Sequence, residues 1–222
     1  MRSRFVQTGF LCLLLSSAAP RAGAQASPSV IRNHFESDAP MRAPAFFDFV
    51  EVGAPGASDW VVTSDANPPS APNIAVQTIS DRPAESIAVA VRRNVSFRDG
   101  RLSIALKRTH GRGGILFRMA SQKDFLVLLV DCASGDAQLI AYRAGKPTKL
   151  AQGQAVLALD WSVLAIEASG TDVKATFAEK PLLSAKDQAP AAGRAGMATA
   201  GPGNVSFDEF ILEPLDSAGG RR

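Results

Sequence analysis

The C-terminal third of the chain constrains the fold most strongly. Between Leu157 and Leu212, short runs in which apolar and polar residues alternate are separated by Gly, Asp and Pro. A period of two, interrupted by turn residues at short intervals, is typical of antiparallel strands with one buried face. This pattern predicts a β structure for the segment, and it identifies no chemical reaction.

The same pattern continues back toward the N-terminus, and no amphipathic helix of three turns interrupts it. The sequence therefore predicts an all-β, antiparallel two-sheet β-sandwich. The predicted strands are 45–52, 60–63, 73–78, 86–92, 101–107, 114–118, 125–132, 137–143, 148–152, 162–168, 172–177, 181–185, 194–200 and 205–212. The run Phe125–Val130 is apolar at every position, which predicts a central strand covered on both faces.

The N-terminus resembles a secretion signal. Arg2 and Arg4 precede a short apolar run at 10–15, and small residues follow up to Ala26. Such a run is too short to span a bilayer, which needs roughly 20 residues, and small-x-small triplets precede a cleavage site. We expect residues 1–26 to be a cleaved signal peptide, which places the mature protein outside the cytoplasm as a secreted or periplasmic protein without a membrane span.

Removal of this segment leaves a chain without net charge. The full chain has 24 Lys+Arg and 21 Asp+Glu, and residues 1–26 contain three arginines and no acidic residue, which leaves 21 of each. A balanced chain has no excess positive charge to hold a phosphate backbone, so nucleic acid is excluded as the expected partner.

The remaining chain is expected to fold as one domain over residues 27–216, with a disordered tail at 217–222. Cys132 is its single cysteine, so it forms no internal disulfide. Cys132 follows an apolar run, and neither His34 nor His110 is in a recognisable pairing with it. A buried, inert thiol is therefore favoured over a nucleophile.

Several segments resemble one known family of secreted bacterial proteins. They are 60–65, 69–77, 99–104 and 113–118 in the first half and 124–127, 161–170, 193–199 and 207–210 in the second. These segments resemble the concanavalin A-like, laminin-G-like jelly rolls, near the domain called 3-keto-disaccharide hydrolase. The resemblance covers about residues 35 to 213. It implies two curved antiparallel sheets packed face to face, with a concave face available to ligands.

One strand departs from the pattern of that family. Its members carry two tyrosines, an arginine and an asparagine where this chain has Phe125, Leu126, Leu129 and Asp131. The substitutions predict a more apolar groove than is usual for the family.

Few residues are candidates for binding a ligand, because the chain has two tryptophans and one tyrosine: Trp60, Trp161 and Tyr142. Sugar sites use exposed Trp or Tyr, whose rings stack while a polar edge forms hydrogen bonds. Trp161 lies in an apolar run and Trp60 in a more open segment, and both are expected to pack in the core rather than to bind a ligand. We therefore predict a ligand site made by Tyr142, Arg143, Asp131 and Arg118.

A catalytic alternative rests on the jelly-roll glucanases of the laminarinase type, which use Glu-x-Asp-x-x-Glu on one strand. Here Glu36 and Asp38 begin the pattern, but Met41 occupies the third place and Pro40 interrupts the strand. We therefore expect no hydrolysis by the two-glutamate retaining mechanism. A hydrolase that resembles the keto-disaccharide domain stays open as an alternative.

Sandwiches of this type often bind a structural Ca²⁺ near the chain termini through carboxylates and carbonyls. Glu36, Asp38 and Asp208 would meet if the first and last strands pair, so they are the candidate ligands. The alternative is that Asp208 caps a strand pair and Glu36 is solvated.

Three functions from different classes follow. The first is a non-catalytic binding module for a glycan or another small ligand on the concave sheet. The second is the carbohydrate-active hydrolase. The third is a structural protein whose apolar concave face meets a protein partner.

Overall fold

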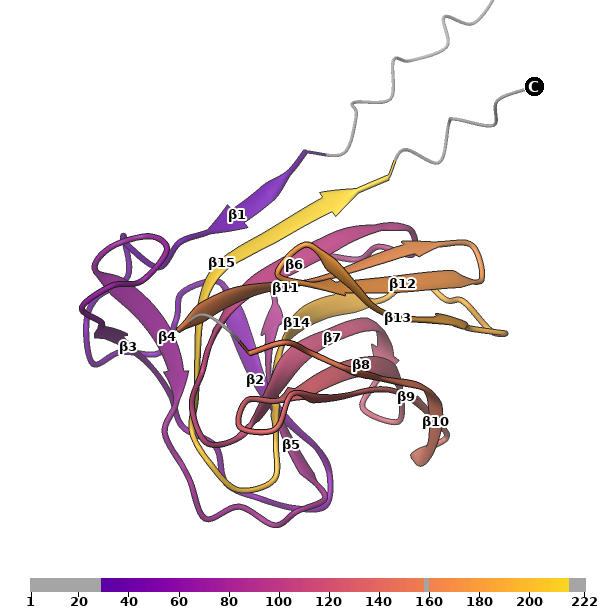
Figure 1. Ribbon diagram of the computed structural model, residues 1–222, viewed down its shortest axis with the longest axis horizontal. Coiled ribbons are helices and arrows are strands. Elements are labelled where there is room, and N and C mark those ends of the chain that lie inside the picture. Colours follow the sequence, from indigo (N-terminus) through magenta and orange to yellow (C-terminus); the bar gives the residue numbers. More distant parts are fainter. Residues whose placement is uncertain (1–28, 158–159, 216–222) are drawn as a thin grey trace, which may run out of the picture.

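The predicted sandwich is confirmed by a computed structural model, which describes residues 29–157 and 160–215. The predicted signal peptide (1–26) and the predicted tail (217–222) lie entirely outside these residues. The described residues contain 15 strands, all antiparallel, in two sheets (Figure 1). No helix long and apolar enough to cross a membrane occurs among these residues.

Sheet A has eight strands. In spatial order they are β13 (Lys180–Lys186), β12 (Asp172–Phe177), β11 (Trp161–Ser169), β6 (Gly100–Lys107), β15 (Val205–Pro214), β4 (Asn73–Gln77) and β3 (Trp60–Ser64), with β1 (Ile31–Asn33) on β15. β1 pairs with the last strand through Ile31 and Leu212, and Figure 1 shows the two side by side. The sequence indicated no strand at β1.

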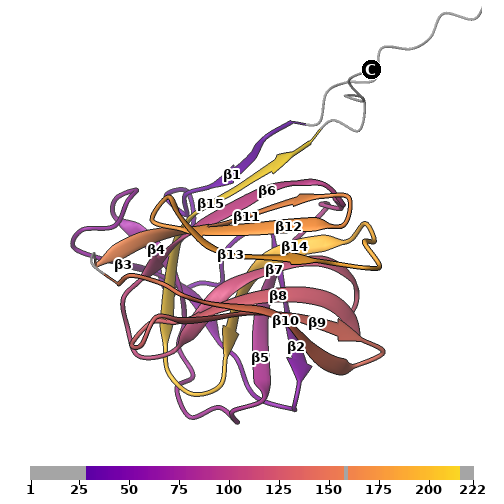
Figure 2. The same ribbon diagram turned by 45° about the vertical axis from the view of Figure 1, so that its right-hand side comes forward.

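Sheet B has seven strands. In spatial order they are β10 (Lys146–Gln154), β9 (Asp136–Arg143), β8 (Asp124–Asp131), β7 (Arg112–Ser121), β14 (Arg194–Ala200), β5 (Ser86–Arg92) and β2 (Phe47–Gly53). In Figure 2 the strands β6, β11 and β12 of sheet A lie above β7, β8 and β9 of sheet B.

The main core fills the space between the two sheets. Alternate residues of each strand enter it, such as Leu126, Leu128 and Val130 of β8 and Leu164 and Ile166 of β11. The intervening residues of β8 are buried as well, on the opposite face of sheet B. The prediction that this strand is covered on both faces is therefore confirmed.

The two tryptophans differ in their surroundings. Trp60 is 3% exposed and packs between Phe49 and Phe207, as predicted. The expectation of a core position for Trp161 is wrong. Trp161 pairs with Lys107 on the outer face of sheet A, where it is half-buried and the Lys107 ammonium lies 5.8 Å from its ring centroid.

The Pro-rich loop at 65–72 lies against the outer face of sheet A. Ser70 donates hydrogen bonds from its backbone N (2.7 Å) and from its hydroxyl (2.8 Å) to Asp208 of β15. Asp65 forms an ion pair with Lys107 of β6. These contacts bury Asp208 completely and fix the loop on the sheet.

Candidate functional site

The face of sheet B that is turned away from sheet A carries a second apolar cluster. Successive residues of a strand point to opposite faces, so the odd-numbered residues of β8 lie here while the even-numbered ones enter the core. The cluster contains Val52, Ile87, Val89, Val91, Leu116, Met119, Phe125, Val127, Leu129, Ala198 and Ala200. We call these residues the floor.

The floor is unusually closed for an outer sheet face, because its members are at most 4% exposed. Side chains on the outside of a flat sheet keep part of their surface in water. Crowding of this degree arises where a sheet curves inward and the side chains converge. We take this face as the concave side of sheet B that the jelly-roll resemblance implies. The predicted apolar groove stays a prediction, because these residues form a closely packed layer with almost no exposed surface.

Tyr142 stands at one end of the floor. Its ring stacks on Phe125, its partner across the β8–β9 ladder, with centroids 4.4 Å apart and planes 14° from parallel. The turn after β9, Ala144 and Gly145, has φ values of 50° and 78°, as a two-residue type I′ turn requires. Burial raises the pKa of the Tyr142 phenol, and the nearby Arg112 charge partly opposes this rise.

Asp131 and Arg112 form the other end of the same face. The two residues are cross-strand partners on β8 and β7. One carboxylate oxygen of Asp131 accepts hydrogen bonds from the backbone N of Ala133 (2.9 Å) and of Ser134 (2.8 Å). Burial raises the pKa of Asp131, but these bonds outweigh burial and lower it, with help from Arg112. Asp131 is therefore an anion and a hydrogen-bond acceptor at neutral pH.

Arg112 is a half-buried cation that makes no side-chain hydrogen bond or ion pair with another described residue. Its charge acts on both Tyr142 and Asp131, which begin and end the same face. Arg112 thus shares the face of its strand partners Asp131 and Ala200, and its side-chain donors have no hydrogen-bond partner among the described residues.

Amide side chains flank this polar end. A shallow hollow of about 500 Å³ lies along β9 and β10, lined by Asp136, Ala137, Gln138, Gln152, Gly153 and Gln154. Gln138 and Gln152 are cross-strand partners, so both amides face the hollow side. Each amide offers donors and an acceptor, which matches the hydroxyl groups of a sugar.

The structure places Arg143 and Arg118 elsewhere. Both bind Asp187, which is 2% exposed: Arg118 Nη1 donates to it at 2.9 Å and Arg143 Nη2 at 2.8 Å. Arg118 also donates to the carbonyl of Gly170 and to Asp99. Of the four predicted ligand residues, Tyr142 and Asp131 share one face, whereas buried Arg118 and half-exposed Arg143 both pair with the buried Asp187.

The position of Arg118 has a local cause. Arg118 has a φ of 52° within an irregularity of β7, so the strand loses its simple alternation there. Its side chain consequently enters the interior with Phe117, while Met119 joins the floor. In a strand without this irregularity, Phe117 and Arg118 would point to opposite faces of sheet B, and Arg118 would face the floor.

The candidate calcium ligands are each engaged by protein donors. Glu36 accepts from the backbone N of Asn73 (2.9 Å), Asp38 from that of Ala45 (3.1 Å), and Asp208 from Ser70. No group of three His, Cys, Asp or Glu suited to a metal occurs among the described residues. The last strand pairs with β1, a strand that the sequence did not predict, and this pairing does not bring the three carboxylates into one cluster. Calcium binding stays a prediction without a ligand set.

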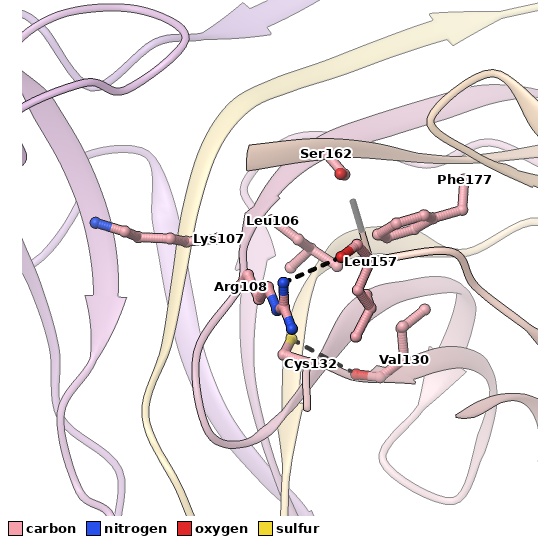
Figure 3. A pocket seen from close by; sticks show the side chains of 8 residues that line it. All are labelled: Leu106, Lys107, Arg108, Val130, Cys132, Leu157, Ser162 and Phe177. Atoms are coloured by element: carbon pink, nitrogen blue, oxygen red, sulfur yellow. Dashed lines mark hydrogen bonds between the residues drawn. The ribbon is translucent and has the colours of Figure 1, made fainter. Parts of the chain in front are cut away.

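Cys132 lies at one end of the core, beside a small cavity that Figure 3 shows. Its Sγ lies 3.8 Å from the carbonyl of Val130, and Arg108 donates to the carbonyl of Leu157 at 3.1 Å. Cys132 is 3% exposed, and burial raises the pKa of its thiol. The thiol is therefore protonated and inert, as the sequence predicted.

The sequence reasoning missed Arg112, Gln138 and Gln152. A usable signal was present for Gln138, because it lies four residues before Tyr142 and shares its face in a strand. Arg112 has no such local signal, and only the pairing of β7 with β8 reveals its position opposite Asp131.

Comparison with known proteins identifies the fold. No family model and no curated protein sequence matches the chain. Among solved structures, carbohydrate-binding module CBM66 from Bacillus subtilis is similar with a TM-score of 0.53 and 16% identity, covering 69% of this chain and 94% of that one. A galectin-like protein of unknown function from Bacillus subtilis has a TM-score of 0.57 and 12% identity, covering 85% and 97%.

An enzyme is found at the same level of similarity. A GH16 protein of the mixed-linkage glucan locus of Bacteroides ovatus, solved with the product G4G4G3G, has a TM-score of 0.57 and 7% identity, covering 82% of this chain and 99% of that one. These likenesses confirm the concanavalin A-like and galectin-like jelly roll as the fold of this chain. At such low identity they establish the fold alone.

Proposed function

We propose that this chain is a non-catalytic glycan-binding module whose site is the hollow face of sheet B. The observation that carries the proposal is the half-buried Tyr142 ring stacked on Phe125, at the end of a face whose other end has free polar groups. A sugar ring laid against Tyr142 would extend along the floor toward Arg112 and Asp131.

The chemistry of the face supports a glycan. Aromatic rings bind the apolar faces of sugar rings, and the phenol adds a polar edge. Arg112 supplies donors, Asp131 supplies an acceptor, and the amides of Gln138 and Gln152 supply both. The similarity in fold to a carbohydrate-binding module and to a glycan-bound enzyme is consistent with this proposal, since sugars are ligands on this scaffold.

The carboxylates of this face support binding without hydrolysis. A retaining glycosidase needs a nucleophile and a protonated acid roughly 5–5.5 Å apart, and the acid needs a raised pKa. Asp131 has a lowered pKa because of its hydrogen bonds to Ala133 and Ser134. Met41, at the third place of the glucanase pattern, is 74% exposed and transfers no proton.

We further propose that the protein acts outside the cytoplasm, as the predicted signal at residues 1–26 requires. Polysaccharides of the cell exterior are then the ligands to test first.

Affinity gel electrophoresis with laminarin and lichenan tests the proposal on residues 27–222. We expect the polysaccharide to slow the migration of the wild type. The Tyr142→Ala variant should migrate equally fast with and without polysaccharide. Tyr142→Phe keeps the stack and should keep most of the retardation. Glu167→Ala is the matched control, because Glu167 is exposed on the outer face of sheet A.

The same samples distinguish the alternative. Release of reducing sugar from laminarin, lichenan or a 3-keto-disaccharide would establish the hydrolase instead. Retardation that survives in Tyr142→Ala would place binding at another surface. Repetition with added Ca²⁺ or a chelator shows whether the predicted calcium contributes.

A further inference from the structure

The edges of the two sheets are protected very unevenly. An edge strand presents unpaired backbone N–H and C=O groups, which pair readily with another strand. Proteins block this pairing with proline, lysine, bulges, short strands or a covering segment. In the described part of the chain, the edges are β1, β3 and β13 in sheet A and β2 and β10 in sheet B.

Four of these edges carry such protection. β10 contains Pro147 and an irregularity, and β13 contains Pro181 and another. β3 is covered by residues 41 and 42, because Met41 N donates to the carbonyl of Val62 (2.8 Å) and Val62 N to that of Arg42 (2.7 Å). β1 is three residues long.

β2 has none of these features. Its sequence, Phe-Asp-Phe-Val-Glu-Val-Gly, lacks proline and lysine and pairs with β5 without irregularity. Arg93 N donates to Phe46 O and Ala54 N to Glu85 O. Because hydrogen-bonded pairs alternate along an antiparallel ladder, the backbone N–H and C=O groups of the even-numbered residues of β2 bond to β5. The backbone groups of Phe47, Phe49 and Glu51 therefore point away from the sheet.

The side chains along this edge are apolar or already neutralised. Phe46, which directly precedes β2, and Phe49 within it are 55% and 38% exposed, so two of the seven exposed large hydrophobic residues of the described chain lie at this edge. Asp48 forms ion pairs with Arg93 (2.7 Å) and Arg194 (3.3 Å). Glu51 is paired with the buried Arg82 (2.9 Å).

We propose that β2 pairs antiparallel with β2 of a second copy of this chain, about a two-fold axis at Phe49. Phe49 then lies opposite Phe49 of the second copy. Phe47 lies opposite Glu51 of the second copy, and Asp48 lies opposite its Val50. The copies fit each other because both acids of the strand are neutralised within their own chain, so like charges do not oppose the approach. A two-fold pairing is also closed and leaves neither β2 edge open.

The pairing joins two seven-stranded sheets into one, so the two hollow faces lie on one continuous surface. This inference concerns the assembly alone and stands whether or not the face binds a glycan. If it does, two sites on one surface would bind a polymer with avidity.

Sedimentation velocity of residues 27–222 over a range of concentrations tests the proposal. We expect the wild type to reach the mass of two chains. Phe49→Lys puts two ammonium groups at the two-fold axis and should sediment as one chain with an unchanged circular dichroism spectrum. Thr148→Lys, on the β10 edge, is the control and should stay a dimer.

Cross-linking tests the register directly. A hydrogen-bonded antiparallel pair has Cα atoms about 5.5 Å apart, which suits a disulfide. Phe49→Cys should therefore form a covalent dimer under mild oxidation, whereas Thr148→Cys should not, and buried Cys132 should not compete. A wild type that stays one chain, or a dimer that Phe49→Cys does not cross-link, overturns the proposal. The first result would leave β2 free for a strand of a different protein.

Discussion

Tyr142 lies on Phe125 with ring centroids 4.4 Å apart and ring planes 14° from parallel. Phe125 is fully buried in the floor, so it holds the outer ring in one orientation. A fixed ring loses little conformational freedom when it binds a ligand, which favours affinity. The pair therefore links the packing of sheet B to its proposed function.

Replacement of Phe125 by Leu should separate these two roles. Leucine keeps the apolar contact of the floor but removes the stacked ring, which is worth about 0.5–1.5 kcal/mol beyond area burial. We expect a thermal midpoint a few degrees lower and weaker retardation by laminarin and lichenan than for wild type. Unchanged retardation at a lowered midpoint would mean that the stack does not position Tyr142.

The ion network around Asp187 should be a main stabilising feature. Removal of one partner of a buried ion pair leaves an uncompensated charge, at a cost of about 3–5 kcal/mol. Asp187→Ala leaves the guanidinium of Arg118, itself 2% exposed, without its main anion. Urea denaturation should show this loss. Asp172→Asn removes an exposed pair with Lys186 and should change the midpoint little. Equal midpoints for both variants would contradict the account.

Asp208 should give the protein a characteristic acid response. Burial raises its pKa, although hydrogen bonds from Ser70 partly oppose the shift. A carboxyl with a raised folded-state pKa binds its proton more tightly when folded, so stability rises as pH falls through that pKa toward the unfolded value of about 3.9. Wild type should therefore gain stability relative to Asp208→Asn over this window, measured by thermal melts.

Asp65 provides a comparison of opposite sign. Its hydrogen bond to Lys107 is the largest cause of a lowered pKa. A lowered folded-state pKa gives stability that is present above about pH 3.9 and is lost as pH falls below it. Wild type should therefore lose stability relative to Asp65→Asn in this lower window. The same trend in both variants would contradict the assigned shifts.

The two tryptophans should differ in their contribution to stability. Truncation of a fully buried Trp costs about 3–5 kcal/mol, and Trp60 is such a residue. Trp161 is half-buried outside the main core, so Trp161→Ala should cost clearly less. Chemical denaturation of both variants gives the comparison. A larger loss for Trp161→Ala would mean that its contact with Lys107 matters more than core packing.

The sequence predicted the strands well because each carries its own local signal. Alternation and turn residues identified Ser86–Arg92, Asp172–Phe177 and Arg194–Ala200 with their observed bounds. β1 was missed because its three residues are too few to show a period, and its position depends on pairing with β15.

The site was predicted only in part because it depends on contacts between distant residues. Alternation places Tyr142 and Asp131 on outward faces of their strands, and this is what the structure has. Nothing local indicates that Arg118 and Arg143 meet at Asp187, which lies 69 and 44 residues away from them. The positive φ of Arg118 turns that side chain inward, and no glycine at this position indicates the irregularity in the sequence.

Amide chemical-shift mapping of residues 27–222, titrated with a lichenan oligosaccharide, tests the central claim most directly. We predict that the largest shifts fall on β8 and β9, around Phe125, Asp131, Gln138 and Tyr142, and on Arg112 of β7. Shifts confined to Glu167 and Lys174 on the outer face of sheet A, or to the surroundings of Cys132, would contradict the assignment of the hollow face of sheet B as the ligand site.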